Sequence, residues 1–271
     1  MRFAGRSAVV TGAGQGIGRA IAHALTAQGM RVLVSDLDGA AAARVAEEIG
    51  GHSLACDVRD PRQIADLVTH ANRVLGQIDL WCSNAGFARG DGDMAVSADD
   101  AQWQDSWDVH VMAHVRACRL ILPDMIARGE GWLLNVASAA GLLSQIGDAA
   151  YSATKHAAVS LAQSLAISHG DQGINVSVVC PLYVATPLLG YDDDRAEDRP
   201  HDRVILPDDV AQALVEGLRA GRFLILPHPE AADLARGRMA DMDRWIEGMR
   251  KLRARVWDDE NPDLRDLHRR I

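Results

Sequence analysis

The chain has 271 residues, of which 48% are hydrophobic, and a formal net charge of −9 at pH 7. This length suits a single α/β domain with a sizeable core, and the longest apolar runs are too short to cross a bilayer. The negative charge argues against general binding to nucleic acid, so we expect neither nucleic acid nor a membrane as a partner.

The first expected elements are a strand at residues 7–11, a glycine-rich loop and a helix at residues 16–28. The loop is the sequence TGAGQGIG at residues 11–18. Strand, glycine loop and helix form the context in which a glycine motif binds phosphate. Glycine lets the backbone approach a pyrophosphate, and the helix N-terminus offers free N–H groups. We therefore predict a dinucleotide site here; the alternative is a tight turn without a ligand.

The second expected strand, residues 31–35, ends at Asp36. A carboxylate at this position can accept hydrogen bonds from both hydroxyls of an adenosine ribose, and it would repel a 2′-phosphate. Leu37 offers no cation to compensate, and Arg19 is the only basic residue nearby. The sequence therefore predicts NAD rather than NADP as the cofactor.

The rest of the chain continues the alternation of strands and helices. We expect a Rossmann-like α/β fold, a doubly wound parallel sheet in a single domain with a C-terminal helical extension, divided into residues 1–228 and 229–271. The further strands are expected at residues 52–56, 79–83, 131–137, 174–180 and 222–226, and the further helices at residues 38–49, 61–75, 100–127, 149–169 and 207–220.

Two features indicate a cytoplasmic protein. A strand that starts within the first ten residues leaves no space for a removable secretory leader. The four cysteines lie in apolar contexts without the spacing of metal ligands, so we expect reduced thiols in the core and no metal site. They are Cys56, Cys82, Cys118 and Cys180.

The helix expected at residues 149–169 carries Tyr151 and Lys155. Their spacing puts a phenol and an ammonium about one turn apart on one face. A free phenol has a pKa of about 10, and a nearby cation favours the phenolate, so this tyrosine is a candidate acid/base. Ser138 lies upstream and can hydrogen-bond both a carbonyl and an alcohol.

These motifs, in this order, resemble those of the short-chain dehydrogenases/reductases of the TGxxxGxG type, over about residues 6–209. The sequence CDV at residues 56–58 is similar to the family's pair that holds the adenine, and SNAG at 83–86 stands where the family has an NNAG-like strand end. Ser138 ends the sequence NVAS, and CPLYVAT at 180–186 resembles the family's PGxVxT turn, which meets the nicotinamide.

The resemblance implies that Ser138, Tyr151 and Lys155 are catalytic and that Lys155 also binds the nicotinamide ribose. It also implies a homodimer or homotetramer assembled through the helices expected at residues 100–127 and 149–169. Together with the arguments above, it gives this set of cofactor-binding candidates: Gly12, Gly14, Gln15, Gly16, Ile17, Gly18, Asp36, Leu37, Asp57, Val58, Asn84, Ala85, Gly86, Tyr151, Lys155, Pro181, Val184 and Thr186.

The chain departs from the family pattern at His110. The family has an asparagine here, in a pattern like DVNV, which holds a water that links the lysine to solvent; this chain has DVHV at residues 108–111. A neutral histidine has one donor and one acceptor, so it can replace the water or relay the proton itself. We include His110 among the catalytic candidates; an impaired enzyme is the alternative. Ser83 and Leu182 are smaller departures, and Leu182 replaces a glycine near the nicotinamide.

Two stretches interrupt the alternation. Residues 187–200 begin apolar and become charged, as expected of a lid over the substrate or of a solvated loop. Residues 233–256 show apolar side chains at helical spacing and predict one helix that packs on its own subunit or reaches a neighbouring active site. A membrane-surface helix is the rival interpretation.

Taken together, the sequence predicts an NAD-dependent oxidoreductase that interconverts a hydrophobic secondary alcohol and its ketone. The expected substrate walls, residues 87–94, 139–146 and 188–191, are mostly apolar. A non-catalytic NAD-binding regulator on the same fold is one alternative. An epimerase or dehydratase that acts on nucleotide sugars is another, although such enzymes resemble TGxxGxxG chains with a longer substrate domain.

Overall fold

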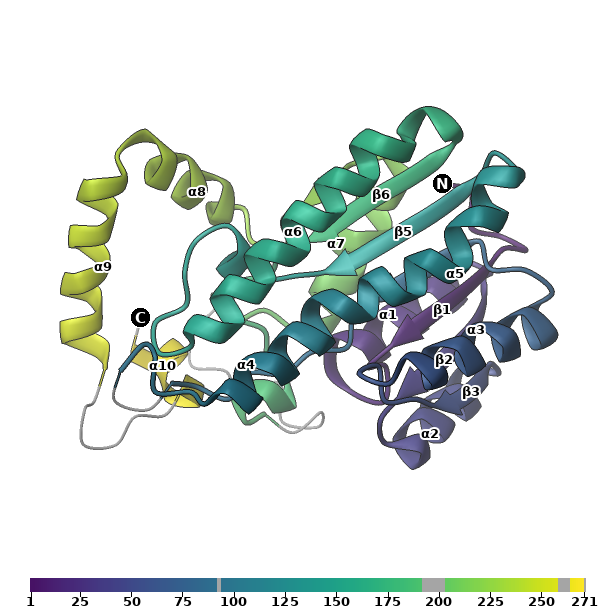
Figure 1. Cartoon of the computed structure of the whole chain (residues 1–271), viewed down its shortest axis with the longest axis horizontal. Coiled ribbons are helices and arrows are strands. Elements are labelled where there is room, and N and C mark those ends of the chain that lie inside the picture. The colour runs from purple at the N-terminus through teal and green to yellow at the C-terminus, as the bar shows by residue number, and fades with distance from the viewer. Residues whose placement is uncertain (92–93, 192–202, 258–263, 271) are drawn as a thin grey trace.

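A computed structural model describes residues 1–91, 94–191, 203–257 and 264–270. Within them the strands form one seven-stranded sheet in the order β3-β2-β1-β4-β5-β6-β7, and every pairing is parallel (Figure 1). This confirms the predicted doubly wound sheet. The strands are β1 (Ser7–Thr11), β2 (Arg31–Asp36), β3 (His52–Ala55), β4 (Leu80–Ser83), β5 (Gly131–Val136), β6 (Ile174–Val179) and β7 (Leu224–Ile225).

The strand order reverses direction at β1. In the register of the sheet, Val9 of β1 lies between Leu33 of β2 and Trp81 of β4. The chain winds one way from β1 to β3 and the other way from β4 to β7. Such a switch point opens a crevice at the carboxyl ends of the strands, which is where open α/β sheets bind ligands.

Helices cover both faces of the sheet. The helices α1 (Gly16–Ala27), α2 (Gly39–Ile49) and α7 (Pro207–Arg219) bury Leu25, Val45 and Leu214 in the core on one face. On the other face, α3 (Pro61–Leu75), α5 (Ala113–Ala127) and α6 (Ala149–His169) bury Leu67, Ile121 and Leu165. The amphipathic periodicity of these segments accounts for their position, because each one hides an apolar stripe against the sheet.

The prediction of a single helix at residues 100–127 is wrong in one respect. The structure divides it into α4 (Asp100–Trp107), a π-helical turn (Asp108–Met112) and α5. A π turn inserts one extra residue without ending the helix, so the apolar pattern on either side stays helical. His110 lies in this turn.

The prediction of a single helix at residues 233–256 is also wrong. The structure has α8 (Glu230–Ala240) and α9 (Met242–Val256), separated at Asp241. Asp241 is extended, with φ −153° and ψ 92°, and its side chain accepts a hydrogen bond from the backbone N–H of Arg244 at 2.9 Å. It therefore caps α9 and stops α8. Figure 1 shows α8 and α9 standing off the end of the sheet, and α10 (Leu264–Arg270) packs against the short turn at Pro187–Leu189. Of the described helices, none is long and apolar enough to span a membrane.

Candidate active site

The loop after β1 and the start of α1 need glycine at three positions. Gly12 and Gly16 have φ values of +62° and +54°, in the left-handed region that favours glycine. A Cβ on Gly12 would lie 2.6 Å from the Cα of Ala85, and one on Gly18 would lie 2.2 Å from the carbonyl oxygen of Gly12. The start of α1 is therefore bare backbone, as a phosphate site requires.

Asp36 lies at the end of β2, beside this loop. Its Oδ2 accepts a hydrogen bond from the Gly14 N–H at 2.8 Å, and its Oδ1 accepts one from the Asp38 N–H at 3.0 Å. These bonds fix the carboxylate, and each oxygen keeps a lone pair for a further donor. Leu37 beside it is 68% exposed and brings no charge. The bare glycine loop and this carboxylate fit a dinucleotide.

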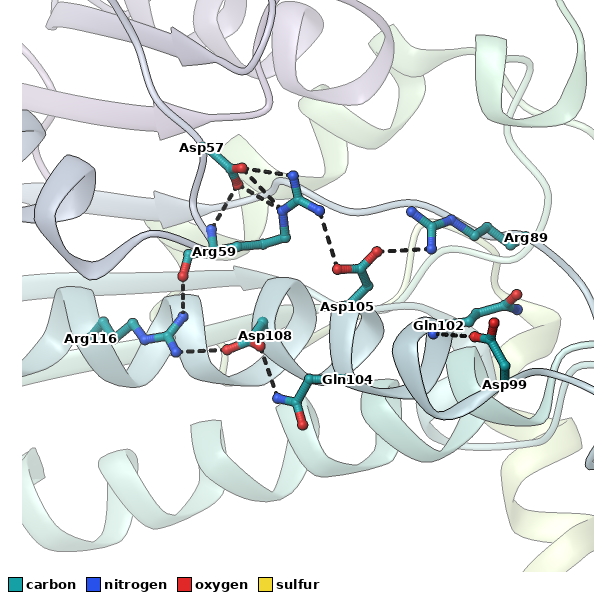
Figure 2. Close-up of polar contacts among 9 residues, drawn as sticks. All are labelled: Asp57, Arg59, Arg89, Asp99, Gln102, Gln104, Asp105, Asp108 and Arg116. Carbon is teal, nitrogen blue, oxygen red and sulfur yellow. Dashed lines mark hydrogen bonds and ion pairs between the residues drawn. The ribbon is translucent and has the colours of Figure 1, made fainter.

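Asp57, the expected adenine contact, is engaged by an arginine. The Arg59 guanidinium lies 2.7 Å from Oδ2 of Asp57 and holds the pKa of that carboxyl below its usual range. Figure 2 shows how the network continues: Arg59 also pairs with Asp105 at 3.1 Å, and Asp105 pairs with Arg89 at 2.9 Å. Arg116 donates to the Arg59 carbonyl oxygen at 2.7 Å, which links this strand end to α5 (Figure 2).

The three residues expected to be catalytic come together from β5 and α6. Lys155 Nζ lies 5.5 Å from the centre of the Tyr151 ring and donates to the carbonyl oxygen of Val136 at 3.1 Å. Ser138 follows β5, and its Oγ accepts from the Ala140 N–H at 3.1 Å. All three line the same cleft as the glycine loop.

Burial sets the charge states of the pair. Burial raises the pKa of Tyr151 to about 12, while a hydrogen bond with Ser138 acts in the opposite direction. Burial lowers the pKa of Lys155 to about 8. The site therefore makes both charged forms costly when each is considered alone, and the phenolate and the ammonium favour each other.

His110 has fixed partners on both nitrogens. Its Nε2 lies 3.2 Å from the Phe87 N–H, and because that group can only donate, Nε2 is the acceptor. The neutral ring then carries its proton on Nδ1, 2.9 Å from Thr154 Oγ1, and Thr154 in turn donates to the Ala150 carbonyl oxygen at 2.8 Å. Burial, together with the charge of Lys155, holds the pKa of His110 well below its usual value. The ring meets Tyr151 edge-on, with centroids 5.5 Å apart.

One cleft of about 1580 Å³ joins these parts. It is lined by all the cofactor-binding candidates except Gly14, whose N–H is bound to Asp36. His110 does not line it and lies behind the wall. The walls also include these members of the expected substrate segments: Phe87, Ala88, Arg89, Gly90, Asp91, Ala139, Ala140, Leu143, Ser144, Gln145, Ile146, Leu188 and Leu189.

Around the predicted nicotinamide turn, the structure places Tyr191, Leu182 and part of the predicted lid. Tyr191 does not line the cleft; it is buried, and its hydroxyl lies 2.6 Å from Nε2 of His268 in α10. Leu182 has a negative φ like every other described non-glycine residue, so it fits where the family has glycine. Of the predicted lid, Pro187–Leu189 forms a short turn at the cleft, and residues 192–200 lie outside the described residues.

Sequence reasoning missed the residues that the C-terminal extension adds to the cleft. The periodicity of residues 233–256 revealed helix but carried no information about which part of the chain the helix faces. Sequence reasoning also missed Arg59, which lines the cleft beside Asp57. The contributions from the extension are Glu230, Leu234, Trp245, Met249, Leu252, Trp257 and Leu267.

Comparison with known proteins agrees with this geometry. A family model described as short chain dehydrogenase matches residues 6–197. The 1-deoxy-11-beta-hydroxypentalenate dehydrogenase of Streptomyces exfoliatus is 32% identical over 253 residues, 91% of each chain. The cyclohexanol dehydrogenase of an Acinetobacter species is 31% identical over 220 residues, 79% of this chain and 87% of that protein. A short chain dehydrogenase/reductase from Burkholderia phymatum, solved in complex with NAD, superposes with a TM-score of 0.79 at 29% identity, covering 90% of this chain and 96% of that one.

Proposed function

This chain belongs to the short-chain dehydrogenase family, and from that premise we propose that it is an NAD-dependent oxidoreductase that interconverts a hydrophobic secondary alcohol and its ketone. The observation that carries the proposal is the convergence of Ser138, Tyr151 and Lys155 on the cleft that contains the bare glycine loop. The relatives named for the oxidation of a cyclic alcohol and of a hydroxylated acid support this reaction class.

The catalytic roles follow from the chemistry of each side chain. The nicotinamide cofactor, when bound, accepts or supplies the hydride. In oxidation, the Tyr151 phenolate takes the proton of the substrate hydroxyl; in reduction, the Tyr151 hydroxyl gives its proton to the developing alkoxide. The ammonium of Lys155 stabilises the phenolate. The Ser138 hydroxyl holds the substrate oxygen, and a well-placed donor of this kind contributes about 3–4 kcal/mol to transition-state stabilisation.

His110 joins this proposal as a positioning residue. Its hydrogen bonds to Phe87 and Thr154 tie the loop after β4 to the helix that carries Tyr151 and Lys155. Asparagine is shorter and cannot span both partners, so His110→Asn is expected to change the rate and its pH profile. If neither changes, His110 has no part in the relay or in positioning.

The preference for NAD rests on Asp36 and Leu37. A carboxylate already held by two backbone N–H groups would face a 2′-phosphate, and the exposed Leu37 cannot neutralise it. We expect a higher kcat/KM with NAD than with NADP, and the reverse order would overturn this preference.

The decisive experiment follows reduced nicotinamide by absorbance, with NAD and a panel of hydrophobic secondary alcohols. Wild type is expected to form NADH and Tyr151→Phe to form none, while both bind NAD equally. If the wild type binds NAD but forms no NADH with any alcohol of the panel, the result would contradict the proposal. It would favour the alternative of a non-catalytic NAD-binding regulator. Cofactor left net-reduced after reaction also excludes an epimerase, which returns its NAD unchanged.

Assembly and location belong to the same proposal. Trp107, Leu120 and Ile167, on α4, α5 and α6, are exposed large apolar residues, which supports a homodimer or homotetramer through these helices.

The four cysteines are free and buried, which supports a reducing, cytoplasmic location.

A further inference from the structure

The C-terminal extension presents a stripe of apolar side chains to the cleft. On α9, Trp245, Met249 and Leu252 follow one another at helical spacing, and all three line the cleft. Leu234 on α8 lines it as well, and it is 46% exposed although it lies inside a cleft wall. These side chains therefore have apolar surface that no described part of the chain covers.

The stripe is specific to one side of α9. Ile246, next to Trp245, is 46% exposed and does not line the cleft. Charged side chains occupy other positions, among them Lys251 and Glu247, which pair with each other at 2.6 Å and are largely solvent-exposed. The polar positions thus face water while the stripe faces the interior of the cleft.

Contacts at both ends of α9 hold this wall against the loop that precedes the catalytic helix. Arg238, at the end of α8, donates to the Leu142 carbonyl oxygen at 3.0 Å and lies 5.3 Å over the Trp245 ring. At the other end, the ring of Trp257 packs on Gly147, where an added Cβ would lie 2.2 Å from it. Residues 142 and 147 lie within the segment between Ser138 and Tyr151, so the wall has a fixed position relative to the reacting groups.

We propose that this stripe is the substrate-binding wall for the part of the substrate that lies away from the reacting carbon, and that it selects bulky alcohols of two or more fused apolar rings. The inference rests on the proposed function and extends it. Apolar surface favours an apolar ligand because burial removes both surfaces from water. A system of fused rings offers the stripe more apolar surface to bury than a single small ring does.

The test compares one small and one bulky substrate, cyclohexanol and decalin-2-ol, in wild type and in Trp245→Ala and Leu252→Ala. Each variant is expected to lower kcat/KM for decalin-2-ol by about tenfold or more, since a lost apolar contact in a substrate pocket changes selectivity by that order. The value for cyclohexanol is expected to stay within about twofold. Ile246→Ala is the matched control on the same helix and is expected to change neither value. Equal losses for both alcohols, no loss for either, or the same effect in the control would overturn the inference.

A binding measurement separates this inference from the proposed function. If wild type oxidises neither alcohol, calorimetric titration of decalin-2-ol into the protein with NADH decides the matter. Weaker binding in Trp245→Ala and Leu252→Ala than in wild type and Ile246→Ala would support the stripe as a binding wall for bulky alcohols. The proposed function would then be wrong while this inference stands. Equal binding in all four proteins, or no binding by wild type, would overturn the wall.

Discussion

At the scale of single residues, Tyr151 and Lys155 lie side by side, and burial shifts the pKa of each away from its charged form. Burial raises the pKa of the phenol to about 12 and lowers the pKa of the ammonium to about 8. A phenolate without the neighbouring cation would be scarce at neutral pH. The environment that disfavours each ion alone is less polar than bulk water, so the attraction between a phenolate and an ammonium is stronger there than in solvent.

Lys155→Met should therefore slow alcohol oxidation in a pH-dependent way. We expect kcat/KM to fall by about 100-fold near pH 7, because the phenolate loses its cation. Above about pH 8 the native lysine itself loses charge, so the gap between the two proteins should narrow there. Steady-state rates over a range of pH check this. A constant ratio across the range would mean that Lys155 acts only through binding and not through its charge.

A second buried histidine, His114, should make the protein sensitive to acid. Burial, with the charge of Lys155 adding to it, lowers the pKa of His114 to about 3, against an unfolded value of about 6.5. Between these values the unfolded chain binds a proton that the folded chain does not, so the free energy of unfolding falls as pH falls through this window. The contribution is up to about 1.4 kcal/mol per pH unit.

His114→Phe should remove that contribution. Urea denaturation at several pH values below about 6.5 is expected to show a shallower decline of unfolding free energy in the variant than in wild type. His52 is exposed, and His52→Phe serves as the control that should leave the slope unchanged. Identical slopes in wild type and His114→Phe would contradict the argument.

Most of the candidate site could be predicted at this scale because its residues lie in local motifs. Asp36 ends a strand, Asn84 and Ser138 each follow one, and parallel strands bring their carboxyl ends to one edge. The engagement of Asp57 by Arg59 could not be predicted, since an ion pair near a helix start has no distinctive spacing. For the same reason the fixed partners of His110 came only from the structure.

At the scale of elements, hydrophobic periodicity located every predicted strand and helix but not the interruptions within helices. The π turn at Asp108–Met112 keeps a helical pattern, so periodicity cannot detect the extra residue. The break at Asp241 has a local signal, an aspartate that caps the next turn, yet the apolar positions on either side stay nearly in phase.

One buried contact of α10 can be tested by substitution. The hydroxyl of Tyr191 lies 2.6 Å from Nε2 of His268, and both side chains are buried. Tyr191→Phe removes one partner from a buried polar group, which costs about 1–3 kcal/mol. Hydrogen exchange of the amides in residues 264–270 should accelerate accordingly.

Tyr183→Phe is the matched control for that experiment. Its ring also lies against His268, with centroids 5.9 Å apart, but its hydroxyl bonds with Gln145 instead. The control should leave exchange in α10 unchanged. Equal exchange in wild type and Tyr191→Phe would show that other contacts hold α10 in place.

At the scale of the whole molecule, the extension closes on the cleft of its own chain. Its residues follow β7 in sequence, yet Leu234, Trp245 and Trp257 lie with Ser138 and Tyr151 around one cavity. Contacts between segments so far apart leave no local pattern, so the sequence favoured packing on the subunit or on a neighbour over a membrane surface but did not decide between the first two. The position of these side chains around the cleft of their own chain favours packing on the same subunit.

Removing residues 229–271 tests the proposed boundary between the sheet domain and the extension. All seven described strands and the glycine loop lie before residue 229, so the shortened chain should stay folded and bind NAD. It should lose the apolar wall and, with it, at least about tenfold in kcat/KM for bulky alcohols. Calorimetric NAD binding and steady-state rates check both parts. If the shortened chain does not fold, the extension is part of the core domain. If it keeps full activity and unchanged assembly, the extension has no part in the substrate site.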